Sequence, residues 1–254
     1  MNIIKIAAIA TLIATPVLAQ EVTFVNPGSE EGMFRQVLND IGTTAEHTFV
    51  QANTPVAATE YFASQNVLTI LSSEWPGNTE FVSPEISNNN IVALLATETV
   101  MCSREFASVD DMSGKTVKIA SWGSEPVAKF LEKFGQEHSV NFVVVPYDGS
   151  GATTRGYLGK DADTIFTIMS KEAALNEDTT NKCFAYSQNG DLAFQFVDAL
   201  IGVNATTELI ESTKESVKLL SQTAEWKEKF SGTSTLIEGD LAAKYQEAVV
   251  NFSK

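Results

Sequence analysis

Apolar segments typical of strands alternate with amphipathic segments typical of helices along most of the chain. The first pair is a strand-like segment at 22–25 and a helix-like segment that ends near Gly42, joined by a polar loop at 26–30. Alternation of this kind predicts an α/β fold with mainly parallel sheets covered by helices. Further strands are expected at 47–51, 67–71, 91–104, 116–120, 141–145, 163–168 and 182–187, and helices at 54–65, after Ser124 and at 241–252.

Two sets of these segments are joined by extended runs, which predicts two lobes. The run IVALLATETVMCSR at 91–104 is long enough to pass from one lobe to the other, and KCFAYS at 182–187 is taken as the return. After that return the chain is expected to be mostly helical. We expect a first lobe of 20–101 and 184–254, a second lobe of 102–183, and hinge crossings at 101–104 and 182–185.

Residues 1–19 are predicted to be a cleaved export signal. Lys5 precedes an apolar run from 6 to 18, and Ala19 suits a cleavage site before Gln20. The alternative is a membrane anchor, which the shortness of the apolar run disfavours. The sequence therefore predicts a periplasmic protein.

Charge excludes two classes of partner. The 254 residues include 17 Lys and Arg against 32 Asp and Glu, a formal net charge of -15. A chain this acidic does not bind nucleic acid by neutralising phosphates. It does not adhere to anionic lipid through a basic patch either.

The cysteines Cys102 and Cys183 are the only two in the chain. An oxidising compartment permits a disulfide between them, and two separately buried thiols are the alternative. The two histidines, His47 and His138, are scattered along the chain and combine poorly with these sulfurs as metal ligands. We therefore expect no metal and no cofactor.

The sequence contains no clear catalytic motif. No histidine or cysteine is spaced so as to pair with a nucleophile. Glu30 and Glu31 are adjacent and would serve either as an acid/base pair or as favourable partners of the following helix dipole. The sequence therefore predicts a protein that is not an enzyme.

Small and polar residues follow the ends of several predicted strands. In open α/β sheets, ligands bind outside the carboxyl ends of the strands. Small residues there expose backbone N–H groups, and a following helix N-terminus favours an anion. Four such loops in an exported two-lobed chain predict binding of a small molecule. They contain Asn26–Ser29, Ser72 and Ser73, Ser121–Ser124, and Tyr147–Gly151.

Several segments, in order, resemble the substrate-binding receptors of tripartite tricarboxylate transporters, the Bug proteins. EVTFVNPG followed by GMFRQVL resembles their first strand, glycine loop and helix, and LTILSS resembles a strand that ends in a polar loop. The run from VALLATETVMCSREF to FLEKF resembles the crossing strand and the start of the second lobe. VVVPYDGSGATTRGYLGKDADTIF is the most similar stretch.

The resemblance implies a two-lobed periplasmic binding protein of type II with a hinge of two strands. It implies a small carboxylate held between the lobes by backbone N–H groups, hydroxyls and water, and a membrane transporter that takes it inward. Carried onto this chain, the contacts would be Asn26, Gly28, Ser29, Ser72 and Ser73 in the first lobe and Ser121, Gly123, Ser124, Tyr147, Gly149 and Ser150 in the second.

Two features depart from the family pattern. The first loop reads PGSEEG, and a carboxylate such as Glu30 near the ligand would favour an amino group. Trp122 stands where small residues are commoner and would cover an apolar part of the ligand. The charge of the ligand therefore stays open between a carboxylate and an amino acid.

The predicted function is capture of a small carboxylate-type metabolite between two lobes and delivery to integral membrane transporter subunits, by a protein expected to be a monomer. One alternative is an exported hydrolase using a serine or Glu30 and Glu31, which turnover of candidate esters would identify. Another is a ligand-sensing module that presents its ligand to a signalling receptor.

Overall fold

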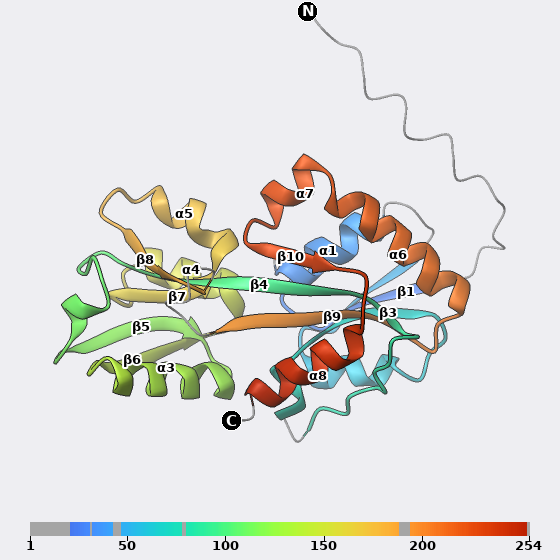
Figure 1. Cartoon of the computed structure of the whole chain (residues 1–254), viewed down its shortest axis with the longest axis horizontal. Helices are drawn as coiled ribbons and strands as arrows, with labels where there is room; N and C mark the ends of the chain where they lie inside the picture. Colours follow the sequence, from blue (N-terminus) through green and yellow to red (C-terminus); the bar gives the residue numbers. More distant parts are fainter. Residues whose placement is uncertain (1–20, 31, 43–46, 78–79, 188–193, 253–254) are drawn as a thin grey trace, which may run out of the picture.

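The structure, a computed structural model, describes residues 21–30, 32–42, 47–77, 80–187 and 194–252. The predicted signal at 1–19 and Glu31 lie outside these residues. Two lobes lie side by side, and two long neighbouring strands, β4 (Ile91–Ser103) and β9 (Gln195–Val203), run through the middle of the molecule (Figure 1). No helix in the described ranges has the length and apolar character needed to cross a membrane.

The first lobe is built on a sheet in the order β2-β1-β3-β9-β4, with β10 also paired to β4. β1 runs parallel to β2 and β3, whereas β9 is antiparallel to both of its neighbours. Besides β4 and β9, its elements are β1 (Val22–Asn26), α1 (Met33–Gly42), β2 (His47–Gln51), α2 (Pro55–Ala58), β3 (Val67–Ser72), α6 (Thr207–Ser221), α7 (Ala224–Lys229), β10 (Thr233–Leu236) and α8 (Leu241–Phe252).

The second lobe continues the sheet in the order β4-β7-β5-β6, and β8 pairs with β4. β5 runs parallel to β6 and β7, as the sequence predicts. Its elements are β5 (Thr116–Trp122), α3 (Glu125–Glu137), β6 (Asn141–Tyr147), α4 (Gly149–Leu158), β7 (Thr164–Ile168), α5 (Glu172–Asn176) and β8 (Lys182–Tyr186). Short 3₁₀ helices lie at Thr59–Tyr61, Trp75–Gly77, Asp110–Met112 and Met169–Lys171.

Each lobe has its own apolar core because its helices bury one face against a sheet. In the first lobe, Val37 and Leu38 of α1 pack in one cluster with Phe24 of β1. In the second, Leu131 of α3 packs in one cluster with Phe166 of β7. The predicted α/β fold is confirmed.

The strand β4 belongs to both lobes. Its first part, up to Glu98, pairs with β9, and its last part, from Thr99 to Ser103, pairs with β7. The pairing partner of this strand therefore changes between Glu98 and Thr99, a few residues before the expected crossing at 101–104.

The return between lobes differs from the sequence-based expectation at 182–185. That segment is β8, which pairs with Val100–Ser103 of β4 inside the second lobe. The strand that pairs with β3 and β4 in the first lobe is β9, which is the next strand after β8 in the chain. We propose that the return is at β9 and that residues 184–187, which were expected in the first lobe, belong to the second.

One local expectation is wrong: the helix expected at 54–65 is a four-residue α2 followed by a 3₁₀ turn. The C-terminal part is mostly helical, as expected, but it also contains the strands β9 and β10, which the sequence analysis did not predict. Both strands pair with β4, whose residues Ile91–Leu95 are wholly buried, so tertiary pairing sets their conformation.

The predicted disulfide is confirmed between Cys102 and Cys183, which are 81 residues apart in sequence. The two residues are direct partners on the antiparallel strands β4 and β8. Because both strands lie in the second lobe at this point, the bridge joins two strands of one lobe and does not tie the two crossing strands together.

Candidate ligand-binding site

The loop after β1 is held by Asn26, whose side chain is fully buried. Its Nδ2 donates to the carbonyl oxygens of Gly28 (3.2 Å) and Ser29 (3.1 Å) and to Oε1 of Gln51 (2.8 Å). Its Oδ1 accepts from the Gly28 N–H at 3.2 Å. Both polar atoms of Asn26 are therefore used in shaping the loop, and its role is to position Gly28 and Ser29.

The first-lobe loop approaches the second lobe at Ser29. A Cβ built on Gly149, the first residue of α4, would lie 3.8 Å from Ser29 Oγ. Ser29 and Glu30 are both exposed on their loop. Two of the loops expected to bind ligand, one from each lobe, therefore meet in space.

The start of α4 has no side-chain cap among the described residues. Asp148 occupies the N-cap position, but its side chain accepts no hydrogen bond from the first turn. Gly149 has a φ of +76°, which glycine adopts without strain, and Ser150 follows it half-buried. The first N–H groups of a ten-residue helix with no side-chain cap favour an anion.

The side chain of Tyr147 makes its contacts within the second lobe. Its hydroxyl donates to Oδ2 of Asp161 at 3.0 Å, and its ring occupies the space above Gly156. Burial, followed by Asp161, raises the pKa of the hydroxyl. The carbonyl of Tyr147 accepts from the N–H of Gly123 at 3.0 Å, so these two loops of the second lobe are linked.

The loop after β5 is partly inside the second lobe. Trp122 is 9% exposed and stacks on Phe166 (ring centroids 5.6 Å apart) and against Phe196 (4.8 Å). Ser121 is fully buried, and its Oγ has no hydrogen-bond partner among the described residues. Ser124 is the N-cap residue of α3, but its side chain does not cap the helix.

At the end of β3, Ser72 and Ser73 are buried and tied to neighbouring strands and helices. The Ser72 carbonyl accepts from the Tyr245 hydroxyl at 3.1 Å, and the Ser73 N–H donates to the Val197 carbonyl at 3.1 Å. Ser73 Oγ accepts from the Val197 N–H at 3.4 Å. These bonds fix the edge of the first lobe that faces the second.

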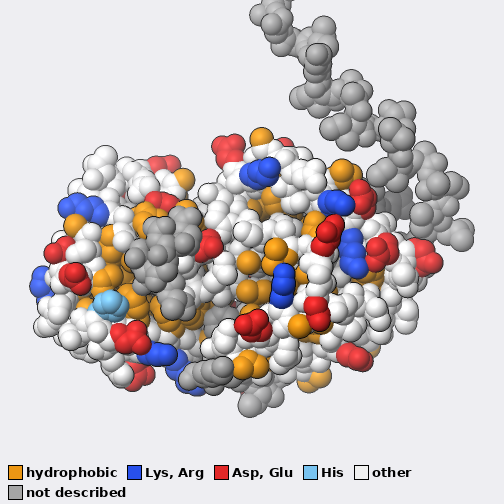
Figure 2. Space-filling model, viewed as in Figure 1, with side chains coloured by type: hydrophobic (Ala, Val, Ile, Leu, Met, Phe, Trp, Pro, Cys, Tyr) orange, Lys and Arg blue, Asp and Glu red, His pale blue; other side chains and the backbone are white. Residues whose placement is uncertain are grey.

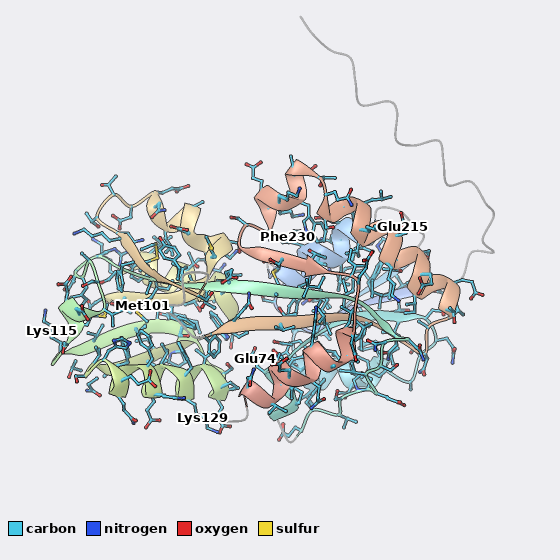
Figure 3. All side chains as sticks on the ribbon, in the orientation of Figure 1. Glu74, Met101, Lys115, Lys129, Glu215 and Phe230 are labelled. Atoms are coloured by element: carbon cyan, nitrogen blue, oxygen red, sulfur yellow. A yellow bond between two sulfur atoms is a disulfide. The ribbon has the colours of Figure 1, made fainter. Side chains whose placement is uncertain are left out.

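Glu74 directly follows Ser73 in the chain and was not among the predicted site residues. It lies between the two lobes, beside the start of β9 (Figure 3). Burial raises the pKa of its carboxyl, while Ser124, Trp122 and Trp75 lower it by less. Ser124 and Trp122 come from the second lobe, so this first-lobe carboxyl contacts side chains across the gap between the lobes.

Asp198 of β9 is a second carboxyl that the sequence analysis missed. It is 3% exposed and is the strand partner of Ser72. Burial raises its pKa to about 8; the Ser72 side chain lowers it and the charge of Glu74 raises it. A single acid inside the apolar run FVDALIGV is a signal that could have pointed to it.

The two lobes touch along much of the face shown in Figure 2. Two pockets, of about 580 and 640 Å³, lie outside the loops described above, one around Phe130 and His138 and one around Phe62 and Asn204. Among the described residues, no group of three or more His, Cys, Asp or Glu is arranged to hold a metal ion.

No family model matches the chain, and no curated protein matches it at a significant level. Solved structures do match over nearly the whole length. The periplasmic binding protein BugD has a TM-score of 0.69 and 11% identity, covering 92% of this chain and 95% of its own.

Two proteins of Rhodopseudomonas palustris are similar to the same extent. MatC with bound malate has a TM-score of 0.67 and 13% identity over 94% of this chain and 98% of its own. Rpa4515 with adipate has a TM-score of 0.68 and 14% identity over 92% and 95%. At these identities the likeness shows that the chain has the fold of periplasmic solute-binding proteins.

Proposed function

We propose that this protein is an exported, periplasmic solute-binding protein that captures a small carboxylate between its lobes and delivers it to a membrane transporter. The observation that carries the proposal is the meeting of Ser29 and Gly149, on loops of opposite lobes, beside the uncapped start of α4. Backbone N–H groups at a helix start bind a carboxylate well. The lobes are joined by two strands, which suits hinge closure around a ligand.

The comparisons support the same class of ligand and transporter. BugD is a periplasmic binding protein, and malate and adipate, seen in MatC and Rpa4515, are both dicarboxylates. We assign the chain on this basis to the receptors of tripartite tricarboxylate transporters. A binding role is favoured over hydrolysis because His47 packs on Phe24 and His138 on Phe134, inside their own lobes.

A thermal-shift screen of the purified mature protein tests the proposal. Dicarboxylates, tricarboxylates, aromatic carboxylates and amino acids would be added one at a time at saturating concentration. A ligand that binds only the folded state raises Tm in proportion to the logarithm of its concentration. Small-angle scattering with the best ligand should show a smaller radius of gyration. An unchanged Tm with every compound would contradict the proposal, and an unchanged radius with a bound ligand would contradict lobe closure.

A further inference from the structure

β7 of the second lobe and β10 of the first lobe follow one another along β4, at the point where its pairing partner changes. β7 pairs with Thr99–Ser103 and β10 with Leu94–Thr97. Met169 directly follows β7, and Gly232 directly precedes β10. Between the two paired segments, the N–H of Glu98 donates to the carbonyl of Gly232 at 2.8 Å. The lobes therefore meet beside the strand that joins them at Met169 and Gly232, which we call the hinge contact.

Met169 fills the space in which a side chain at position 232 would lie. A Cβ built on Gly232 would be 2.6 Å from Cβ of Met169 and 2.9 Å from its Cγ and its Sδ. Non-bonded carbon atoms are at their best separation at about 3.5–4.0 Å, so these distances are strongly repulsive. A methionine can turn its Cγ and Sδ away by changing rotamer, but its Cβ is fixed to the backbone. Relief of the clash therefore requires the two backbones, and with them the two lobes, to move apart.

The hinge contact lies on the same side of the molecule as the candidate ligand-binding site. In the first lobe, the hydroxyl of Thr233, which begins β10, donates to Sδ of Met33 at 3.9 Å. Met33 begins α1, shortly after the loop that carries Ser29. In the second lobe, the 3₁₀ helix that follows β7 lies beside α4, which begins at Gly149. Movement of the lobes apart at the hinge contact would therefore also separate Ser29 from Gly149.

We infer that Gly232 is a positioning residue for lobe closure, which acts through Met169 and not by touching the ligand. The absence of a side chain at this position lets the two lobes approach until Met169 rests on the backbone of Gly232. The hinge contact then sets the closest angle that the lobes can reach. The inference rests on the proposed function, because it assigns a residue to the closure that holds the ligand.

Backbone conformation and space are two separate requirements at position 232, and a second glycine separates them. Gly232 has a φ of +75°, which glycine adopts without strain. Gly114 also has a φ of +75°, but a Cβ built there meets nothing within 4 Å. Gly232→Ala and Gly114→Ala therefore introduce the same backbone strain, and only Gly232→Ala adds a clash between the lobes.

Distances between spin labels on the two lobes test the inference without any ligand. Both native cysteines are in the disulfide, so labels attach only to those introduced by Ala174→Cys on α5 and Glu228→Cys on α7, at exposed positions. Pulsed electron spin resonance of this labelled parent should show a short-distance population that corresponds to lobes in contact. Gly232→Ala should reduce that population at least threefold, and Gly114→Ala should leave it unchanged.

Removing Met169 should rescue the alanine variant. Met169→Gly takes away all three atoms that a new Cβ on Gly232 would meet. Combined with Gly232→Ala, it should restore the short-distance population to within about twofold of the parent. Combined with Gly114→Ala, it should restore nothing, because there is no clash to relieve. Circular dichroism and Tm confirm that each variant is folded.

Affinity gives a second measurement of the same clash. The variants are titrated calorimetrically with malate, with adipate and with the compound that raises Tm most in the thermal-shift screen. Gly232→Ala should bind at least tenfold more weakly than the parent, because the closed form that holds the ligand is out of reach. Gly114→Ala should stay within about twofold of the parent, and the double variant Gly232→Ala with Met169→Gly within about threefold.

The outcomes distinguish the inference from the function on which it rests. If Gly232→Ala keeps the distances of the parent, or if Met169→Gly does not restore them, the inference is wrong and the proposed function is unaffected. If the distances change and recover as expected but no compound binds the parent, the proposed function fails, and Gly232 still sets how closely the lobes approach.

Discussion

The Oγ of Ser187 accepts a hydrogen bond of 2.8 Å from the backbone N–H of Thr99, at the point where β4 passes from one lobe to the other. The same hydroxyl donates to Oε2 of Glu98, and Oε1 of Glu98 accepts from Nε2 of Gln195 at 2.8 Å. Thr99 Oγ1 donates to the carbonyl of Phe194 at 2.7 Å. One hydroxyl thus links the end of the second lobe to the strand that carries both lobes.

Replacing Ser187 with alanine should destabilise the protein. The substitution leaves the enclosed N–H of Thr99 without its partner, which costs about 1–2 kcal/mol. Urea unfolding measures this change. Ser212→Ala, which removes an exposed hydroxyl bonded only to the Leu209 carbonyl, is the matched control and should cost less than about 0.5 kcal/mol. Equal losses in the two variants would contradict the role given to Ser187.

Removing the disulfide should lower stability without preventing ligand binding. Replacing Cys102 and Cys183 together by alanine frees a loop of 81 residues in the unfolded chain, at a cost of about 2–4 kcal/mol. Both cysteines lie in the second lobe, so the affinity of the folded variant should stay within about threefold of the parent. Intact mass of the parent, alkylated without reduction, checks the bridge itself: two alkylated thiols would refute it.

Adding a methyl group at Gly149 should weaken ligand binding beyond its effect on folding. Gly149 has a φ of +76°, so Gly149→Ala carries a backbone strain of about 1 kcal/mol, and its new Cβ points into the gap beside Ser29. Gly114 has a φ of +75°, and a Cβ there meets nothing within 4 Å. Gly114→Ala should therefore lose the same stability with unchanged affinity. Calorimetric titration of both variants with the ligand measures the two affinities. Equal affinities would show that Gly149 does not lie in the binding site.

Replacing Asp198 with asparagine should stabilise the free protein at neutral pH. Burial raises the pKa of Asp198 to about 8 from 3.8, so the folded state holds a proton that the unfolded state releases between these values. The parent therefore loses stability as pH rises from about 4 to about 8, and the asparagine variant lacks this loss. Urea unfolding at pH 4, 5.5 and 7 should show a difference that grows with pH. A constant difference would show that Asp198 is ionised in the folded protein.

Amphipathic helices and short apolar strands were predictable. The faces of α1 and α3 follow the helical period, and Val37, Leu38, Val127 and Leu131 are buried on them. β9 was missed because a strand buried on both faces shows no alternation. Asp198 and Gly202 also interrupt its apolar run.

The loops of the candidate site could be predicted from the sequence, but the directions and contacts of their side chains could not. Ser29 and Gly149 follow strand ends, and the rule for α/β sheets places them at the same edge. The direction of the Tyr147 hydroxyl depends on Asp161, and the enclosure of Glu74 depends on the second lobe covering it. Contacts of this kind arise only when distant segments pack, so local sequence carries no signal for them.

The position of β9 between β3 and β4 also sets an order in which the chain can acquire its structure. The second lobe is formed by one continuous stretch from Thr99 to Ser187, whereas the sheet of the first lobe stays split until β9, about 90 residues after β4, inserts between its halves. Closing that long loop is entropically costly and slow compared with local pairing. Refolding should therefore give an early species with a native second lobe and an exposed, unpaired edge on β3, and this species is the one most prone to aggregate.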